Sequence, residues 1–368
     1  MQVKPSRDFG VSSVLGAGSV ESLPCQRFKL QELRQFVETH AQSLDAEAGR
    51  NPFATAAWLR PYLAHCATAS MDYAAVGSDA SGWMLLQRAA PGAEWRALNN
   101  YYASLYSPWA GAAWPDQAAR WRSPGPVLNL MPLAEQQAAQ LAQAWRARGW
   151  LVRSYDCFAN WVLPCAGQRF ADFMAQRPSA LLNTWKRKRR RFERGDEGAR
   201  IEIVQDPGRV DAAMDAYEAV YQRSWKQAEP YPGFIRAWAR TCAERGWLRL
   251  GLAWVGEQAV AAQFWFTVEG RAYIFKLAYD EAFKPWSAGT VLSAALFEQA
   301  LDQDQVHEVD YLTGDDAYKS HWMNTCQRRV GLVACNPRHP AGLWRGSKEW
   351  LGEATQRWRT PEAGVSGA

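Results

Sequence analysis

Histidine is scarce in this sequence, and its cysteines are widely spaced. The 368 residues include five histidines and seven cysteines, and no Cys-x-x-Cys or His-x-x-x-His pair occurs. Closely spaced ligand pairs are typical of zinc sites, so we expect no metal. An odd number of widely spaced cysteines predicts reduced thiols rather than a disulfide framework. A nucleophilic Cys–His pair stays open, because such partners meet in space and not in sequence.

Long apolar runs are also missing. No stretch reaches the roughly 18 apolar residues that a membrane-spanning helix needs. The N-terminal segment carries Lys4, Arg7, Asp8 and Glu21 without a compact apolar core, a pattern that argues against a signal peptide. With 48% hydrophobic and 21% charged residues, the composition is typical of a globular protein. We therefore expect a cytoplasmic protein, and the length predicts roughly two domains.

Positive charge is confined to one segment. The formal net charge is +5, and residues 186–194 (KRKRRRFER) contain seven cations and one anion, so the other residues sum to −1. A protein covered in positive charge, such as a histone-like nucleic-acid binder, is excluded. Three interpretations of the segment stay open. The first is a solvated helix face whose charges pair within the protein. The second is a binding site for an acidic glycan, a lipid or the phosphates of CoA. The third is a binding site for RNA such as tRNA.

Hydrophobic periodicity predicts the secondary structure. In the first half we expect strands at 72–77, 82–88 and 150–163, and a helix from Pro132 to Gly149. The second half contains three short strands separated by tight turns, at 247–255, 259–268 and 271–279, which predict an antiparallel meander. A helix at 289–302 and strands at 308–312 and 329–334 follow. This order predicts an α+β fold, with mixed and mostly antiparallel sheets flanked by helices.

Two polar segments in the second half carry the candidate chemistry. In the first, Tyr279–Thr290, a strand ends, a loop of small residues follows and a helix begins. The first turn of a helix has unpaired N–H groups that bind anions, and Lys284 adds a positive charge. Ser287 and Thr290 either cap this helix or bind a phosphate oxygen. The second segment, Asp310–Trp322, places polar groups at a strand end and on a short helix.

These segments, in this order, resemble the CelD-type acetyltransferase domain of the GNAT superfamily, which is related to FemAB-like aminoacyl transferases. The resemblance covers about residues 180–335. It rests on the following features: Ser224-Trp225-Lys226 after a helix, the small-residue hairpin at 256–266, Tyr279-Asp280 ending a strand, Ser287 and Gly289 opening a helix, Asp310 four residues before Gly314, and Tyr318-Lys319 before Trp322. One departure is the phosphate loop, where Ser287 replaces the first glycine of the usual family pattern.

The resemblance implies acyl transfer from a thioester, most simply acetyl-CoA or another acyl-CoA as donor substrate, to an amine. The acceptor would be a small molecule or a glycan, in polysaccharide or cell-envelope metabolism. The implied site residues are these: Asp310 as base and Tyr318 as acid; Lys284, Ser287, Ala288, Gly289 and Thr290 for the phosphates of the donor; and Trp225, Lys226, Tyr279 and Lys319 for the acceptor. A splayed strand near 276–279 would polarise the thioester carbonyl.

The resemblance also implies a domain organisation. We expect a degenerate GNAT-like domain at 28–180, a GNAT acyltransferase domain at 181–345 and a flexible tail at 346–368. The motif RGWL occurs at 148–151 and again at 245–248, which agrees with a duplication. Two alternatives remain. One is a FemAB-like enzyme that uses aminoacyl-tRNA, and the other is a non-catalytic accessory protein of exopolysaccharide synthesis.

Overall fold

The computed structural model describes residues 23–46, 51–107 and 121–359. Its strands form one twelve-stranded sheet in the order β1-β2-β3-β4-β5-β12-β6-β11-β10-β9-β8-β7. Neighbouring strands are antiparallel except for β4 with β5 and β10 with β11. The strands are Cys25–Phe28 (β1), Asp72–Ser78 (β2), Gly82–Arg88 (β3), Trp95–Ala97 (β4), Val127–Ala134 (β5), Leu151–Pro164 (β6), Arg200–Val204 (β7), Leu248–Val255 (β8), Gln258–Val268 (β9), Arg271–Tyr279 (β10), Glu308–Asp310 (β11) and Thr325–Cys335 (β12).

Helices flank this sheet, so the predicted α+β class is confirmed. The α-helices are Leu30–Thr39 (α1), Ala41–Asp45 (α2), Ala56–His65 (α3), Glu135–Ala147 (α5), Phe170–Ala175 (α6), Ser179–Arg194 (α7), Val210–Gln222 (α8), Pro232–Glu244 (α9), Ala288–Glu298 (α10) and Pro340–Arg359 (α11). Two 3₁₀ turns bear on the site, Glu281–Trp286 (η4) and Ala317–His321 (η6). None of the helices in the described part of the chain is long and apolar enough to cross a membrane.

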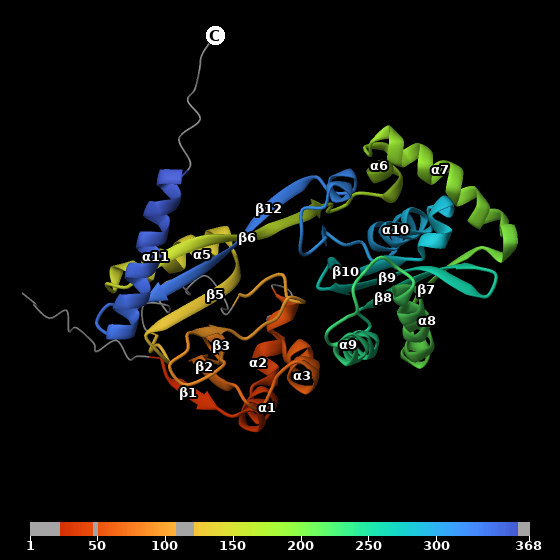
Figure 1. The fold of residues 1–368 in the computed structure, drawn as a ribbon. Coiled ribbons are helices and arrows are strands. Elements are labelled where there is room, and N and C mark those ends of the chain that lie inside the picture. The colour runs from red at the N-terminus through yellow and green to blue at the C-terminus, as the bar shows by residue number, and fades with distance from the viewer. Residues whose placement is uncertain (1–22, 47–50, 108–120, 360–368) are drawn as a thin grey trace, which may run out of the picture.

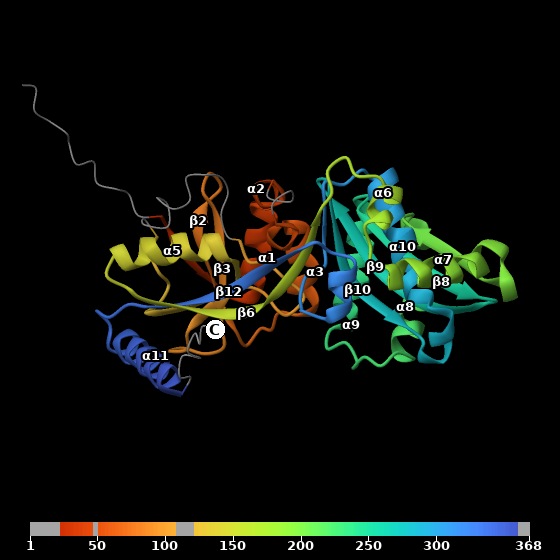
Figure 2. The same cartoon turned by 90° about the horizontal axis from the view of Figure 1, so that it is seen from above.

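The two halves of the chain repeat one element order. In each half an edge strand leads through helices into three antiparallel strands, and the next strand then pairs in parallel, as β4 with β5 and β10 with β11. The last strands are exchanged, because β12 pairs with β5 while β6 pairs with β11. Figures 1 and 2 show β6 and β12 running side by side between the halves. The molecule is thus built as two tandem units of similar topology, which agrees with the predicted duplication.

An apolar core continues across the junction of the halves. Trp58 of α3 lies 4.9 Å, between ring centroids, from both Phe234 and Trp238 of α9. All three side chains are at least 99% buried. Burying aromatic rings of this size contributes roughly 1.5–3 kcal/mol each. The shared core fixes the two halves against one another, so groups from both can form one site.

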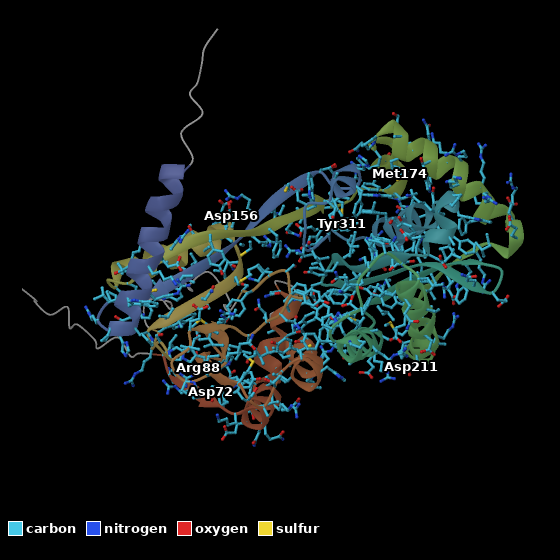
Figure 3. All side chains as sticks on the ribbon, in the orientation of Figure 1. Asp72, Arg88, Asp156, Met174, Asp211 and Tyr311 are labelled. Atoms are coloured by element: carbon cyan, nitrogen blue, oxygen red, sulfur yellow. The ribbon has the colours of Figure 1, made fainter. Side chains whose placement is uncertain are left out.

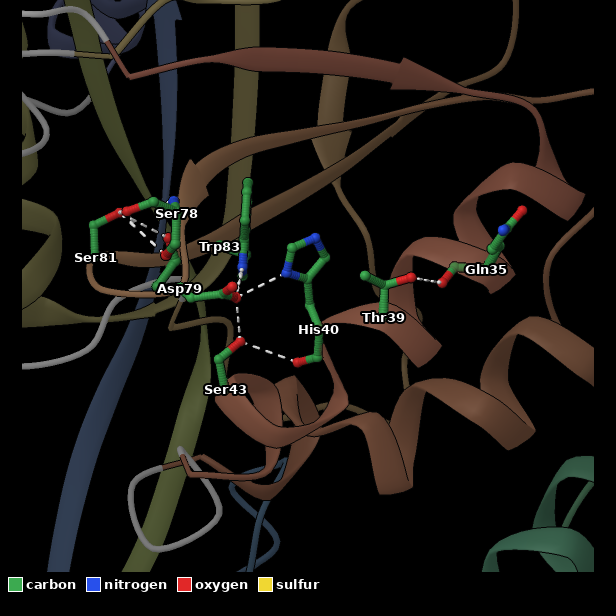
Figure 4. Close-up of polar contacts among 9 residues, drawn as sticks. Gln35, Thr39, His40, Ser43, Ser78, Asp79, Ser81 and Trp83 are labelled. Atoms are coloured by element: carbon green, nitrogen blue, oxygen red, sulfur yellow. Dashed lines mark hydrogen bonds and ion pairs between the residues drawn. The ribbon is translucent and has the colours of Figure 1, made fainter.

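Within the first half, a cluster of polar side chains around Asp79 connects a helix to the sheet. Asp79, in the turn between β2 and β3, accepts hydrogen bonds from Ser43 Oγ at 2.5 Å and Trp83 Nε1 at 2.9 Å, and contacts His40 Nδ1 at 2.8 Å (Figure 4). The bond from Ser43, followed by that from Trp83, lowers the pKa of the Asp79 carboxyl to about 2. Because the Ser43 hydroxyl bonds to the carboxylate and not to the imidazole, this cluster is a structural tie and not a nucleophile with its base.

The structure bears on three boundaries that the sequence predicted. The helix predicted from Pro132 begins at Glu135, because Pro132 is part of β5. Met131 and Pro132 lie opposite the single residue Gly331 of β12, so β5 has a bulge there, which tolerates the missing N–H. The tail predicted over 346–368 is helical as far as Arg359, as the end of α11, and residues 360–368 lie outside the described residues. The boundary between 180 and 181 falls inside α7, and the division 28–180 and 181–345 stays a proposal.

Candidate active site

The candidate site begins where two parallel strands part. β10 and β11 pair only over Arg271–Tyr273 and Glu308–Asp310. Beyond Tyr273, β10 continues to Tyr279 paired with β9 but no longer with β11. A bulge at Phe275 shifts the register of β10 against β9 at the same point. A bulge bends its strand and increases its twist. One edge of β10 therefore carries backbone groups without a strand partner, within the described residues, and faces the segment that follows β11.

A cavity of about 260 Å³ lies in this opening. It is lined by residues 274–277 of β10 and, after β11, by residues 311–313, Asp316, Tyr318 and Lys319. Lys226 also lines it, as do Tyr101 and Tyr102 of the first half. Figure 3 places Tyr311 at the junction of the two halves. Residues of both halves thus line the cavity.

A buried carboxylate holds the two halves together beside this cavity. Glu229 forms an ion pair of 2.6 Å with Lys276 of β10, and the two side chains are 8% and 13% exposed. The hydroxyls of Tyr101 and Tyr102 donate to Glu229 at 2.5 and 2.8 Å. Burial opposes the charged carboxylate, but Lys276 and the two tyrosines outweigh it and lower the pKa of Glu229. Glu229 is therefore an anion that ties Lys276 in the splayed strand to the first half.

The two other lysines of the cavity differ in their surroundings. Lys319 is buried, and its Nζ donates to the carbonyls of Thr313 and Gly314 at 2.5 and 3.2 Å and lies 3.4 Å from Asp316 Oδ2. Those contacts fix the loop after β11. Lys226 is half-buried, and burial followed by the charge of Lys276 lowers its pKa to about 8. Its ammonium lies 5.8 Å from the ring centroid of Trp225.

The loop before α10 has the features of an anion site. Ser287 takes a left-handed conformation, with φ of +50°, and its side chain does not cap the helix. The N–H groups of Thr290 and Val291 bond to the carbonyl of Ser287, and those of Ala288 and Gly289 have no partner among the described residues. Two unpaired N–H groups at the positive end of a helix favour a phosphate. Lys284 lies exposed in the preceding turn.

Buried polar bonds hold this helix start in place. Gln263 of β9 donates through Nε2 to the carbonyl of Gly289 at 3.1 Å and to Ser293 Oγ at 2.7 Å. Trp265 in turn donates to Gln263 Oε1 at 2.9 Å. The aromatic ring of Tyr279 lies against Gly289 and contacts the ring of Trp225 in a tilted arrangement, at 4.5 Å between centroids. The contacts Gly289–Tyr279–Trp225 connect the helix start with Lys226, which lines the cavity.

The cationic helix α7 flanks the same loop. Lys188 Nζ donates to the carbonyl of Pro285, and the Arg191 guanidinium carbon lies 3.6 Å from the ring centroid of Trp286. Arg189 pairs with Glu193, while Arg191 and Arg194 pair with the acids that follow the helix. Lys186, Arg187 and Arg190 have no acidic partner among the described residues. Intradomain pairing thus accounts for only part of the cationic segment.

Asp310 does not line the cavity. The side chain is 6% exposed, and Oδ1 accepts bonds from Asn160 Nδ2 at 2.6 Å and from the N–H of Leu312 at 2.7 Å. Arg329 donates to the same Asn160 at 2.6 Å. Burial raises the pKa of Asp310 despite the nearby Arg329. Asp310 instead holds Leu312 in a left-handed conformation, with φ of +56°, and so shapes the cavity wall.

The structure therefore groups the predicted residues into two sets. Lys226, Tyr318 and Lys319 line the cavity, and burial raises the pKa of Tyr318 to about 12. Lys284, Ser287, Ala288, Gly289 and Thr290 form the helix start, with Tyr279 and Trp225 beside it. Sequence reasoning missed Tyr101, Tyr102, Glu229, Lys276 and Asp316. Asp316 lies in a segment that was singled out, but the other four carry no local motif.

Other chemistries find little support in the described residues. No group of three or more His, Cys, Asp or Glu side chains lies close enough to hold a metal ion there. In that same part of the chain no hydrogen bond joins a cysteine to a histidine, and burial raises the pKa of Cys66 and Cys165 to about 12. A thiol with a raised pKa is a poor nucleophile. The Cys–His alternative therefore has no geometric basis here.

The chain resembles known proteins in part of its sequence and in its fold. Residues 179–320 match the family model of the acetyltransferase (GNAT) domain. The C-terminal domain of a putative lysylphosphatidylglycerol synthetase from Agrobacterium fabrum superposes with a TM-score of 0.53 and 14% identity, covering 90% of this chain and 99% of that one. FemX superposes with a TM-score of 0.55 and 10% identity, covering 86% and 98%. At such identities the likeness shows the fold. Curated protein sequences give no match.

Proposed function

Because residues 179–320 form a GNAT acetyltransferase domain, we propose that the protein is an N-acyltransferase that moves an acyl group, most simply acetyl, from acyl-CoA to an amine. One observation carries the proposal: the splayed strand β10 faces a cavity, and the unpaired helix start of α10 follows the same strand. Acyl transfer needs an anchor for the pyrophosphate and a donor group for the carbonyl oxygen. The helix start supports the first role and the free edge of β10 the second.

Side chains of the cavity supply the proton transfers in this proposal. The amine attacks the thioester carbonyl, the C–S bond breaks, and the thiolate takes a proton from Tyr318 Oη. Its raised pKa, about 12, keeps this hydroxyl protonated at neutral pH. Asp316, which lines the cavity, replaces the buried Asp310 as the carboxylate that accepts the proton of the amine. We retain Trp225 and Tyr279 as acceptor contacts.

A substitution at the helix start tests the anchor for the donor. A methyl group on Gly289 would meet only the ring of Tyr279, at 3.7 Å, so Gly289→Ala fits the folded protein. In a helix the Cα–Cβ bond tilts toward the N-terminus, where the phosphate would approach. We expect Gly289→Ala to weaken acetyl-CoA binding about tenfold, or about 1.4 kcal/mol, by calorimetry. The control is the melting temperature of the variant, which we expect to be unchanged or higher. Equal affinities in the two proteins would remove the loop 284–290 from the proposal.

The FemAB-like alternative keeps one supporting observation: Lys186, Arg187 and Arg190 of α7 have no acidic partner in the part of the chain that the structure describes. The test is filter binding of tRNA at several salt concentrations, with the wild type and with a variant in which all three residues are changed to Ala. If the protein uses acyl-CoA, we expect tRNA binding to depend on salt equally in the two proteins. A matched control changes three ion-paired residues instead, Arg60, Arg209 and Arg240. If tRNA binds and the slope of log K against log salt falls by roughly two to three units only in the α7 variant, the alternative gains the donor role.

A further inference from the structure

Charge is unbalanced in the cavity that the proposed function uses. Three lysines line it, namely Lys226, Lys276 and Lys319, and two carboxylates, Glu229 and Asp316, pair with two of them. Glu229 pairs with Lys276 at 2.6 Å, and Asp316 lies 3.4 Å from Lys319. Each carboxylate is therefore already bound to another lysine. Lys226 remains without a counter-charge among the described residues.

The remaining polar groups do not fill this role. The hydroxyls of Tyr101 and Tyr102 donate to Glu229, and within the described part of the chain neither of them is hydrogen-bonded to Lys226. Among the residues that the structure describes, the Lys226 ammonium contacts only the ring of Trp225, at 5.8 Å from the centroid, so its N–H donors are free for a ligand. A half-buried ammonium without an acceptor is unfavourable, and an anion in the cavity would relieve this. The site is thus complementary to a ligand that carries negative charge.

We propose that this cavity binds a small anionic group, a carboxylate or a phosphate, against the ammonium of Lys226. The inference rests on the proposed function, since it specifies the substrates of the same cavity. The anion belongs either to the amine acceptor, such as an amine that also carries an acidic group, or to the acyl group of the donor. In both cases Lys226 is a specificity-determining residue.

The pH dependence follows from the groups that face Lys226. Lys276 and Lys319 disfavour its charged form, Glu229 and Asp316 favour it, and burial has the largest effect, so its pKa falls to about 8. Only the protonated form attracts an anion. Affinity for acetate, which is ionised above about pH 6, should therefore change little between about pH 6 and 7 and fall by nearly tenfold per pH unit above about 9.

Nuclear magnetic resonance can observe Lys226 directly. The sequence contains nine lysines, so reductive methylation with ¹³C-formaldehyde, which keeps the positive charge, gives few signals. Lys226→Arg assigns the Lys226 signal, and Lys29, whose side chain is 71% exposed, serves as the internal control. The full chain is titrated with acetate and with inorganic phosphate at constant ionic strength. We expect a saturable shift of the Lys226 signal, several times larger than that of Lys29. Equal shifts of both signals would overturn the inference.

Further titrations identify the source of the anion and separate this inference from the proposed function. If the acyl group carries the anion, succinyl-CoA shifts the Lys226 signal and prevents the phosphate shift, whereas acetyl-CoA does neither. If the acceptor carries it, phosphate still shifts the signal in protein saturated with acetyl-CoA. Failure of acetyl-CoA to bind, measured by calorimetry, contradicts the proposed function but not an anion site at Lys226. An insensitive Lys226 in protein that binds acetyl-CoA contradicts only the inference.

Discussion

Glu229→Ala should lower the free energy of unfolding by about 3–5 kcal/mol. The substitution leaves Lys276 without its partner, and the side chain of Lys276 is only 13% exposed. Removing one member of a buried ion pair has this cost because the remaining charge is desolvated and unpaired. The hydroxyls of Tyr101 and Tyr102 lose their acceptor as well. Urea unfolding of the wild type and the variant, at equal m-values, measures the difference.

A double variant separates the ion pair from other effects. Glu229→Leu combined with Lys276→Met removes both charges, and we expect it to recover most of the lost stability. The pH dependence gives a second check. Since the folded pKa of Glu229 lies below the unfolded value of 4.5, its stabilisation is complete above pH 4.5 and is lost as pH falls through the folded pKa. A Glu229→Ala protein as stable as the wild type would show that this carboxylate does not join the two halves.

Tyr318→Phe should reduce turnover by about 100-fold and leave the fold intact. The side chain is 40% exposed and lines the cavity, and its hydroxyl is the proposed proton donor for the leaving thiolate.

Asp310→Asn should act differently. It removes a buried charge near Arg329 that also bonds to Leu312, so we expect a stability loss of about 2 kcal/mol.

The measurement for this pair is the rate of CoA release from acetyl-CoA with an amine panel, together with thermal unfolding of each protein. Wild-type turnover in Tyr318→Phe would remove the acid role. An Asp310→Asn protein with wild-type stability and greatly reduced turnover would restore Asp310 as a base, as the sequence first led us to propose.

Local patterns predicted the elements that depend on local physics. Alternating apolar residues and tight turns placed β3 at its observed bounds and the meander β8–β10 within one residue at each end. Pro132 misled because a proline suits both a helix start and a strand bulge, and only the partner strand β12 decides between them. The exchange of β6 and β12 has no local signal, since their pairing joins residues up to about 180 positions apart.

The site was predicted in part for the same reason. The resemblance located the helix start at Ser287–Gly289 and the cavity residues Lys226, Tyr318 and Lys319, because these lie in motifs. Tyr101 and Tyr102 reach Glu229 across more than 120 residues of sequence, and no pattern marks such a contact. Asp310 has the residue type of a base, and only burial and its bonds to Asn160 and Leu312 reveal a positioning role.

Calorimetric titration of the full chain with acetyl-CoA tests the central claim most directly. The account predicts saturable binding at one site per chain, weakened by Gly289→Ala and insensitive to the triple substitution of Lys186, Arg187 and Arg190. A chain that binds neither acetyl-CoA nor CoA, while its thermal unfolding remains cooperative, would contradict an acyl-CoA transferase and leave the aminoacyl-tRNA enzyme or the non-catalytic accessory protein.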